Sequence, residues 1–74
     1  MKNIKVYSKS NCTQCENLKM WLKVKNIKFN EVDVIENKEA YDKIIKNGKS
    51  SLPVLEIEDE FVEYNVFNDI LELI

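Results

Sequence analysis

Apolar and polar positions alternate strictly in two short stretches in the first half of the chain. Residues 4–7 and 31–34 each place apolar side chains at every second position. A period of two is typical of β-strands, because successive side chains point to opposite faces of a sheet. The pattern therefore predicts two strands separated by a longer element.

Between these strands the apolar period changes to that of a helix. Cys15, Leu18 and Leu22 recur at the spacing of one helix face, and three lysines, the first of them Lys19, are expected on the other side. An amphipathic helix is therefore predicted from residue 12 to about residue 26.

Residues 37–48 carry the signals of a second helix. Asn37 is a favourable N-cap residue, and the Asn-Gly pair at the end of the stretch is a typical stop. Tyr41, Ile44 and Ile45 are expected to form its buried face.

The remaining residues predict a β-hairpin and a last helix. Leu55 and Ile57 alternate with Glu56 and Glu58, which predicts a strand over residues 53–57. The acidic turn that follows leads into residues 61–64 and predicts a hairpin, although it contains no glycine. Glu56 and the acidic residues 58–60 are expected to lie in solvent at a sheet edge, where charge discourages aggregation. Asn65 is expected to open and cap a helix that continues to the end of the chain.

The order strand, helix, strand, helix, strand, strand, helix predicts an α/β fold of the thioredoxin-like type. A right-handed crossover makes the first two strands parallel neighbours, and the closing hairpin adds an antiparallel pair. We therefore expect a four-stranded mixed sheet flanked by three helices on its two faces. A single thioredoxin-like domain is expected to span residues 1–74.

Composition and charge narrow the classes of partner. The 74 residues are 45% hydrophobic, with one Gly and one Pro, which is typical of a compact folded chain. Eleven Lys plus Arg and thirteen Asp plus Glu are mixed along the sequence, so no basic patch for nucleic acid is expected. No apolar run approaches the ~20 residues of a membrane helix, and the N-terminal residues lack a signal-peptide pattern. We expect a cytoplasmic monomer that binds neither nucleic acid nor membrane.

The two cysteines, Cys12 and Cys15, form a C-x-x-C pair at the predicted strand-to-helix junction. A disulfide between them closes too short a loop to stabilise the fold, which favours a redox or metal-binding role. The unpaired amides and dipole at a helix N-terminus favour a thiolate. Cys12 is therefore expected to be the exposed attacking sulfur, accepting hydrogen bonds from the amides of Gln14 and Cys15. Cys15 is expected to be the buried thiol that resolves the mixed disulfide.

Two other roles remain open for this pair. A zinc site takes four ligands, and the chain offers two cysteines and no histidine. The alternative function is therefore a dimeric carrier of a metal or an iron–sulfur cluster, and a third is a redox-inert adaptor with the same fold. The redox function needs no bound cofactor, and no metal site within one chain is expected.

The segment "YSKSNCTQC" after the first strand and "LPVLEI" at the third resemble the glutaredoxin family, and the resemblance covers nearly the whole chain. It implies a dithiol–disulfide oxidoreductase that reduces disulfides in protein substrates. It implies that Cys12 is the nucleophile and Cys15 the resolving cysteine, with electrons supplied by a reductase or a low-molecular-weight thiol. It also implies that Lys9 is the basic residue before the active-site loop and that Pro53 follows Leu52 through a cis peptide bond.

Two departures from the family pattern affect the expected substrate. Thr13-Gln14 replaces the Pro-Tyr of ordinary glutaredoxins and is closer to the small redoxins that supply electrons to ribonucleotide reductase. The glycine pair that follows the fourth strand in glutaredoxins is replaced by Glu63 and Tyr64. Weak or absent dependence on glutathione is therefore expected. The residues expected to contact substrate are Lys9, Thr13, Gln14, Leu52, Pro53, Tyr64 and Asn65.

Overall fold

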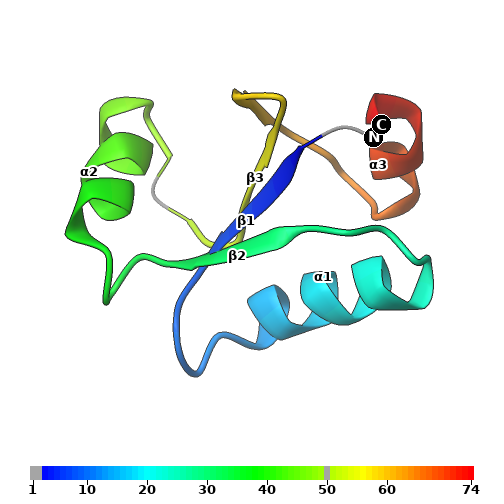
Figure 1. The fold of residues 1–74 in the computed structure, drawn as a ribbon, viewed down its shortest axis with the longest axis horizontal. Coiled ribbons are helices and arrows are strands. Elements are labelled where there is room, and N and C mark those ends of the chain that lie inside the picture. Colours follow the sequence, from blue (N-terminus) through cyan, green and yellow to red (C-terminus); the bar gives the residue numbers. More distant parts are fainter. Residues whose placement is uncertain (1–2, 50) are drawn as a thin grey trace.

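The computed structural model describes residues 3–49 and 51–74 and places the elements in the predicted order (Figure 1). The elements are β1 (Ile4–Ser8), α1 (Thr13–Val24), β2 (Asn30–Asp33), α2 (Lys38–Lys46), β3 (Val54–Ile57), β4 (Glu60–Val62) and α3 (Asn68–Leu73). The α/β order is confirmed, and the largest change of boundary is at the start of the last helix.

The four strands form one mixed sheet in the order β2-β1-β3-β4. β1 is parallel to β2, with Val6 opposite Glu31, and antiparallel to β3, with Val6 opposite Leu55. β3 and β4 form the predicted antiparallel hairpin. Because β1 is held on both sides, the loop that leaves its C-terminal end starts from a fixed position in the middle of the sheet.

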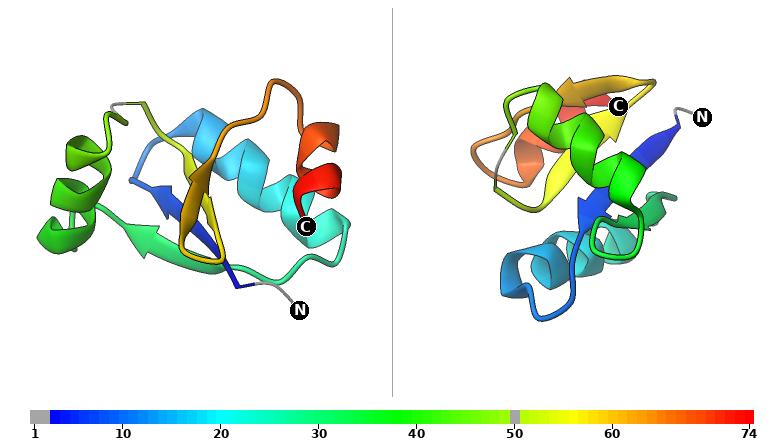
Figure 2. Two further views of the ribbon diagram at one scale, coloured as in Figure 1. Left: turned by 90° about the horizontal axis from the view of Figure 1, so that it is seen from above. Right: turned by 90° about the vertical axis from the view of Figure 1, so that its left-hand side faces the viewer.

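Helices cover both faces of this sheet, as predicted (Figure 2). α1 and α3 pack on one face, and α2 packs on the other. The core under α1 and α3 consists of Ile4, Val6, Leu18, Leu22, Leu55, Ile57 and Ile70. The smaller core under α2 consists of Tyr7, Val34, Ala40, Ile44 and Val54.

α2 begins and ends as predicted but buries a narrower face. The Asn37 side chain accepts a hydrogen bond from the Ala40 amide at 3.1 Å, which confirms the N-cap. Ala40 and Ile44 face the sheet, whereas Tyr41 and Ile45 are each 45% exposed. The prediction that these two residues are buried is wrong, because they line a surface hollow instead of the core.

The hairpin turn adopts backbone angles that usually favour glycine. Glu58 and Asp59 both have positive φ, at 51° and 67°. Positive φ at both central residues is the geometry of a type I′ turn, whose twist matches that of the paired strands. The hairpin therefore forms in spite of the missing glycine.

The prediction that Glu56 lies in solvent is wrong, because its side chain is almost fully buried at 1% exposure. The Tyr7 hydroxyl donates to Oε1 at 3.0 Å, and the Lys43 ammonium donates to Oε2 at 2.9 Å. The Lys5 ammonium lies 3.8 Å from Oε1. Strand alternation alone does not show that β3 lies between two other strands with both faces covered, so Glu56 was assigned to the wrong environment.

Burial of the Tyr7 hydroxyl and its hydrogen bond to the Glu56 carboxylate raise the pKa of Tyr7 above its usual value. The Lys43 ammonium also lies 5.6 Å from the centre of the Phe61 ring, which packs at 5.7 Å from the Tyr7 ring. One buried carboxylate therefore connects α2 to the central strand through charged and aromatic contacts.

α3 begins at Asn68, and the prediction that Asn65 opens and caps it is wrong. Phe67 occupies the N-cap position, and its side chain makes no capping hydrogen bond. The Asp69 carboxylate instead accepts hydrogen bonds from the amides of Asn65 and Val66, at 3.0 and 3.3 Å. Because the carboxylate takes these two amides, the segment before Asn68 forms a turn rather than the first turn of the helix.

Replacing Glu56 with alanine is expected to lower the free energy of unfolding by about 3 kcal/mol, because the buried Tyr7 hydroxyl and the Lys43 ammonium lose their acceptor. Urea denaturation followed by tryptophan fluorescence measures this change. The control is Glu60→Ala, which removes an exposed carboxylate of the same hairpin and is expected to cost less than about 0.5 kcal/mol. Equal losses in the two variants would contradict the structural role assigned to Glu56.

Candidate active site

Cys12 lies at the junction of β1 and α1, where it forms the N-cap of the helix. Its backbone is extended, with φ −109° and ψ 103°, and its Sγ accepts a hydrogen bond from the Cys15 amide at 3.1 Å. Asn11, just before it, has a positive φ of 59°, a conformation that asparagine adopts more readily than most residues. This turn brings the sulfur to the open end of the helix.

Only one of the two amides expected to bond to this sulfur does so among the described contacts. The Cys15 amide donates to Sγ, whereas no such bond is found from the Gln14 amide. The remaining unpaired amides and the helix dipole still place partial positive charge beside Cys12. The position of the Cys12 sulfur at the helix N-terminus therefore has the electrostatic character that stabilises a thiolate.

Cys15 lies one turn further along α1 and is completely buried, whereas Cys12 is partly exposed. The two residues are joined by a disulfide, with their Cα atoms 5.2 Å apart. That separation is within the usual range for a disulfide. Because Cys15 shares the inner face of α1 with Leu18, its sulfur approaches Cys12 from the core side.

A second feature of α1 is a nearly buried lysine one turn after Cys15. The Lys19 ammonium donates to the Glu16 carboxylate at 2.8 Å and to the Glu31 carboxylate at 2.7 Å. The buried Ser8 hydroxyl at the end of β1 also donates to Glu31, at 3.0 Å. The expectation that Lys19 lies on the solvent side of the helix is wrong, because it connects α1 to β2.

These contacts shift two ionisation equilibria. The hydrogen bonds with Glu16 and Glu31 raise the pKa of Lys19, and burial of the ammonium only partly opposes them. The hydrogen bond from Lys19 lowers the pKa of Glu31, helped by the hydroxyl of Ser8. The network therefore remains charged at neutral pH and holds the helix that carries both cysteines against the sheet.

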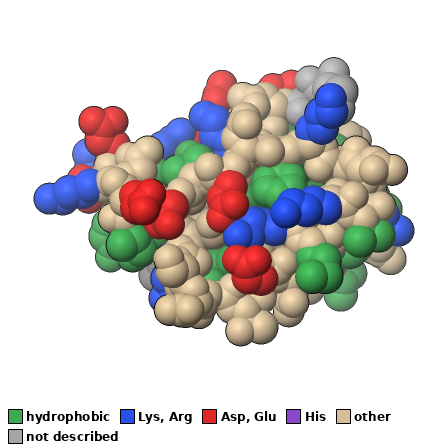
Figure 3. Space-filling view, turned by 60° about the horizontal axis from the view of Figure 1, so that its bottom comes forward, with side chains coloured by type: hydrophobic (Ala, Val, Ile, Leu, Met, Phe, Trp, Pro, Cys, Tyr) green, Lys and Arg blue, Asp and Glu red, His purple; other side chains and the backbone are tan. Residues whose placement is uncertain are grey.

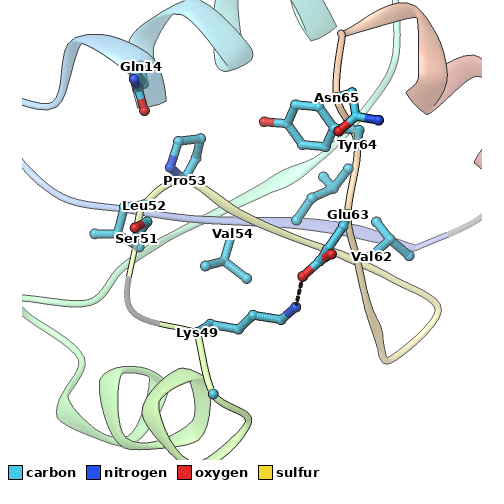
Figure 4. Close-up of a pocket in the computed structure, with 12 residues that line it drawn as sticks. Gln14, Lys49, Ser51, Leu52, Pro53, Val54, Val62, Glu63, Tyr64 and Asn65 are labelled. Atoms are coloured by element: carbon cyan, nitrogen blue, oxygen red, sulfur yellow. Dashed lines mark hydrogen bonds and ion pairs between the residues drawn. The ribbon is translucent and has the colours of Figure 1, made fainter.

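Five of the predicted substrate residues line one groove of 450 Å³, which we call the proline groove (Figure 4). They are Gln14, Leu52, Pro53, Tyr64 and Asn65. The Leu52–Pro53 peptide bond is cis, as the family resemblance implied. Figure 4 shows Pro53 between Gln14 of α1 and the ring of Tyr64, so three distant segments of the chain meet there.

The remaining predicted residues line a second hollow of 640 Å³, which we call the cysteine hollow. It contains Cys12, Lys9 and Thr13, and it shares Gln14 and Leu52 with the proline groove. The structure therefore divides the predicted residues over two adjoining hollows, of which the cysteine hollow contains Cys12. Of the predicted residues, Pro53, Tyr64 and Asn65 belong to the proline groove alone.

The cysteine hollow has an apolar wall that was not assigned to the site from the sequence. Ile35, Tyr41 and Ile45 line it, and their side chains are 68%, 45% and 45% exposed. Tyr41 and Ile45 stand four positions apart on α2, a spacing that indicates a shared helix side but not which surface it meets. The packing of α2 on the sheet decides that these side chains share a hollow with Cys12.

An ion pair at the proline groove was also missed. The Lys49 ammonium donates to the Glu63 carboxylate at 2.8 Å, as Figure 4 shows. This hydrogen bond and the charge of Lys49 lower the pKa of Glu63. The two residues come from different loops, so no local sequence signal indicates that they meet.

The surface over α1 and β2 carries both signs of charge. Figure 3 shows acidic and basic side chains lying beside one another on this face.

Within residues 3–49 and 51–74, no group of three or more His, Cys, Asp and Glu side chains is placed to hold a metal ion. In the same part of the chain, no helix has the length and apolar character needed to cross a membrane.

Residues 4–62 match the glutaredoxin family. The chain belongs to the glutaredoxin family. It is 41% identical to the glutaredoxin-like protein NrdH of Lactococcus lactis subsp. cremoris strain MG1363 over 56 aligned residues. These residues cover 76% of this chain and 78% of that protein.

One further relative by sequence and one solved structure are also similar to this chain. The N-acetyl-S-hydroxy-L-cysteine reductase of Bacillus subtilis strain 168 is 39% identical over 56 residues, covering 74% of this chain and 60% of that protein. The solved structure of the glutaredoxin-like NrdH-redoxin of Escherichia coli superposes with a TM-score of 0.85 at 24% identity, covering 97% of this chain and 95% of that one. The fold is therefore thioredoxin-like, and this glutaredoxin-family protein is a dithiol–disulfide oxidoreductase whose cysteine pair is Cys12 and Cys15.

Alkylation of the reduced protein is expected to label Cys12 at least about tenfold faster than Cys15, because Cys12 is the partly exposed sulfur at the helix end. A limiting amount of iodoacetamide at mildly acidic pH, followed by peptide mass spectrometry, gives the two rates. Cys15→Ser is the matched control, in which labelling of Cys12 should persist. Faster labelling of Cys15 would contradict the assignment of the two sulfurs.

Lys19→Met is expected to lower the free energy of unfolding by about 1 kcal/mol at neutral pH, a value limited by solvent screening of the half-exposed Glu31. The pKa of Glu31 is lower in the folded protein than in the unfolded chain. Its contribution to the free energy of unfolding is therefore complete at pH values above its pKa in the unfolded chain, and it is lost as the pH falls through its pKa in the folded protein. The pKa of Lys19 is higher in the folded protein than in the unfolded chain. Its contribution to the free energy of unfolding is therefore complete at pH values below its pKa in the unfolded chain, and it is lost as the pH rises through its pKa in the folded protein.

The difference between wild type and Lys19→Met is therefore expected to be largest near neutral pH and to shrink toward strongly acidic and strongly alkaline pH. Urea titrations at a series of pH values measure it. Lys25→Met is the matched control, because Lys25 is an exposed lysine at the C-cap of the same helix, whereas the charge of Lys23 also lowers the pKa of Glu31. A difference that stays constant from neutral to acidic pH would contradict the ion pair with Glu31.

Proposed function

We propose that the protein reduces disulfide bonds in other proteins through the Cys12–Cys15 pair. The observation that carries this proposal is the seat of Cys12, a partly exposed sulfur at the N-cap of α1 with the buried Cys15 directly behind it. One sulfur is open to a substrate and the other is shielded until the first has reacted. This order is what a two-step dithiol exchange requires.

In the first step the Cys12 thiolate attacks one sulfur of the substrate disulfide. A mixed disulfide forms, and the other substrate sulfur leaves as a thiolate that takes a proton from water. Cys15 then loses its proton and attacks the Cys12 sulfur, which releases the second substrate thiol. The substrate gains two electrons, and the protein is left with the disulfide that the structure contains.

The proposed substrate contacts follow from the two hollows. Lys9 and Thr13 contact the substrate beside the attacked sulfur, because they line the cysteine hollow with Cys12. Gln14 and Leu52 line both hollows and are placed to contact substrate on either side of the disulfide. Pro53, Tyr64 and Asn65 contact the part of the substrate that enters the proline groove.

The protein that restores the dithiol is proposed to be a reductase of the thioredoxin reductase type, with little or no dependence on glutathione. The Thr13-Gln14 dipeptide and the 41% identity to a glutaredoxin-like NrdH protein support a place among the redoxins that serve ribonucleotide reductase. The proposed location is the cytoplasm, and the proposed working form is a monomer.

A second candidate substrate is a small sulfenic acid. The 39% identity to an N-acetyl-S-hydroxy-L-cysteine reductase favours it. The same dithiol would reduce the S–OH bond, releasing the substrate as a thiol and the hydroxyl as water while Cys12 and Cys15 are oxidised to the disulfide. This chemistry uses the sulfurs in the same order as protein disulfide reduction.

Cys12→Ser is expected to lower the rate of insulin disulfide reduction by at least about 100-fold, because the attacking thiolate is lost. Cys15→Ser keeps the attacking sulfur and is expected to accumulate a mixed disulfide with the substrate, visible by non-reducing electrophoresis. Thr13→Ser serves as a conservative control at the same turn. Undiminished reduction by Cys12→Ser would contradict the dithiol mechanism.

A further inference from the structure

We propose that the Lys49–Glu63 ion pair makes this protein selective against disulfides that carry a carboxylate near the sulfur. The Lys49 ammonium already donates a hydrogen bond to Glu63, so it is not available to an anion of the substrate. The groove therefore favours substrates without negative charge. This inference rests on the proposed function and names Lys49 and Glu63 as residues that determine its specificity.

The positions of the two side chains support this assignment. Lys49 lies in the segment that follows α2, and Glu63 lies directly after β4, so the bond spans two loops that both line the groove (Figure 4). Among the described residues of the groove, Lys49 is the only one with a positive charge. Its ammonium already donates to Glu63 at 2.8 Å.

Exposure determines what an incoming anion meets. The Lys49 side chain is 24% exposed, whereas the Glu63 side chain is 85% exposed. A carboxylate entering the groove therefore encounters the free side of Glu63 before it reaches the ammonium. It has to displace Glu63 to gain the charge-assisted hydrogen bond that Lys49 would otherwise donate.

The rest of the groove offers no comparable site for an anion. Its other described side chains are polar and uncharged or apolar, including Gln14, Pro53, Tyr64 and Asn65. Lys9 is another cation of the site, but it lines the cysteine hollow together with Cys12. An uncharged segment, such as the extended backbone around a protein cysteine, enters the proline groove without opposing Glu63.

The size of the effect is limited, because an ion pair with one largely exposed partner is weak and screened by salt. Selectivity of several-fold is therefore expected, and it should decrease as the ionic strength increases. The decrease separates a charge effect from a change in packing.

The test compares two disulfides that follow the same reaction. Glutathione disulfide carries carboxylates, and bis(2-hydroxyethyl) disulfide is uncharged. In both cases the reduced protein transfers two electrons, forms the Cys12–Cys15 disulfide and releases two thiols. Acid quenching and alkylation of the remaining protein thiols give the second-order rate for each disulfide, and their ratio measures selectivity.

Glu63→Gln is expected to raise the rate ratio of glutathione disulfide to the uncharged disulfide by about fivefold at low salt. The gain should fall toward one at about 0.5 M salt, where the screening length is only a few ångströms. Adding Lys49→Gln should abolish the gain, because the released ammonium is then absent. Glu60→Gln removes an equal charge from β4 outside the groove and should leave the ratio unchanged.

The same data separate failure of this inference from failure of the proposed function. If both disulfides oxidise the wild type but Glu63→Gln leaves the ratio unchanged, the selectivity assignment is overturned. An equal gain in Glu60→Gln, or a gain that persists with Lys49→Gln, overturns it as well. If neither disulfide oxidises the wild-type dithiol, the proposed function is the claim that fails.

Discussion

The chemistry of this protein depends on one turn that seats a sulfur at the end of a helix. β1 is paired on both sides, so its last residue has a fixed position, and the loop to α1 is short. Asn11 takes a left-handed conformation and Cys12 an extended one, which directs Sγ toward the Cys15 amide. Because a helix N-terminus presents unpaired amides and partial positive charge, the fold itself favours the ionised sulfur. Burial of Cys15 one turn later makes the two sulfurs unequal.

Two charge networks, each with one buried or nearly buried member and a half-exposed partner, hold the layers around this turn. On one face Glu56 connects the sheet to α2 through Lys43, and on the other Lys19 connects α1 to β2 through Glu31. Removing charges from water is costly, so such pairs add little to the total free energy, yet losing one partner leaves a buried group without compensation. Their effect is to link the position of each helix to the sheet. α1 therefore holds the cysteines in a constant relation to the strand before them.

The two hollows around the cysteines differ in chemical character. The cysteine hollow has an apolar wall formed by exposed side chains from α2 and the segment before it, whereas the proline groove contains the ion pair of Lys49 and Glu63. Gln14, Ser51 and Leu52 line both hollows. A substrate that spans both hollows would place its disulfide near Cys12, with apolar contacts on one side and uncharged groups on the other. The proposed selectivity among disulfides rests on this difference between the two hollows.

The features that the sequence determined by itself are those that depend on near neighbours. Strand alternation, the Asn37 cap and the spacing of Cys12 and Cys15 are set within a few residues, so the fold class and reactive pair follow from them. Only the tertiary structure decided that Glu56 is buried and that Lys49 meets Glu63. Periodicity assigns a residue to a face, but strand order and helix placement decide whether that face is covered and which distant loops meet.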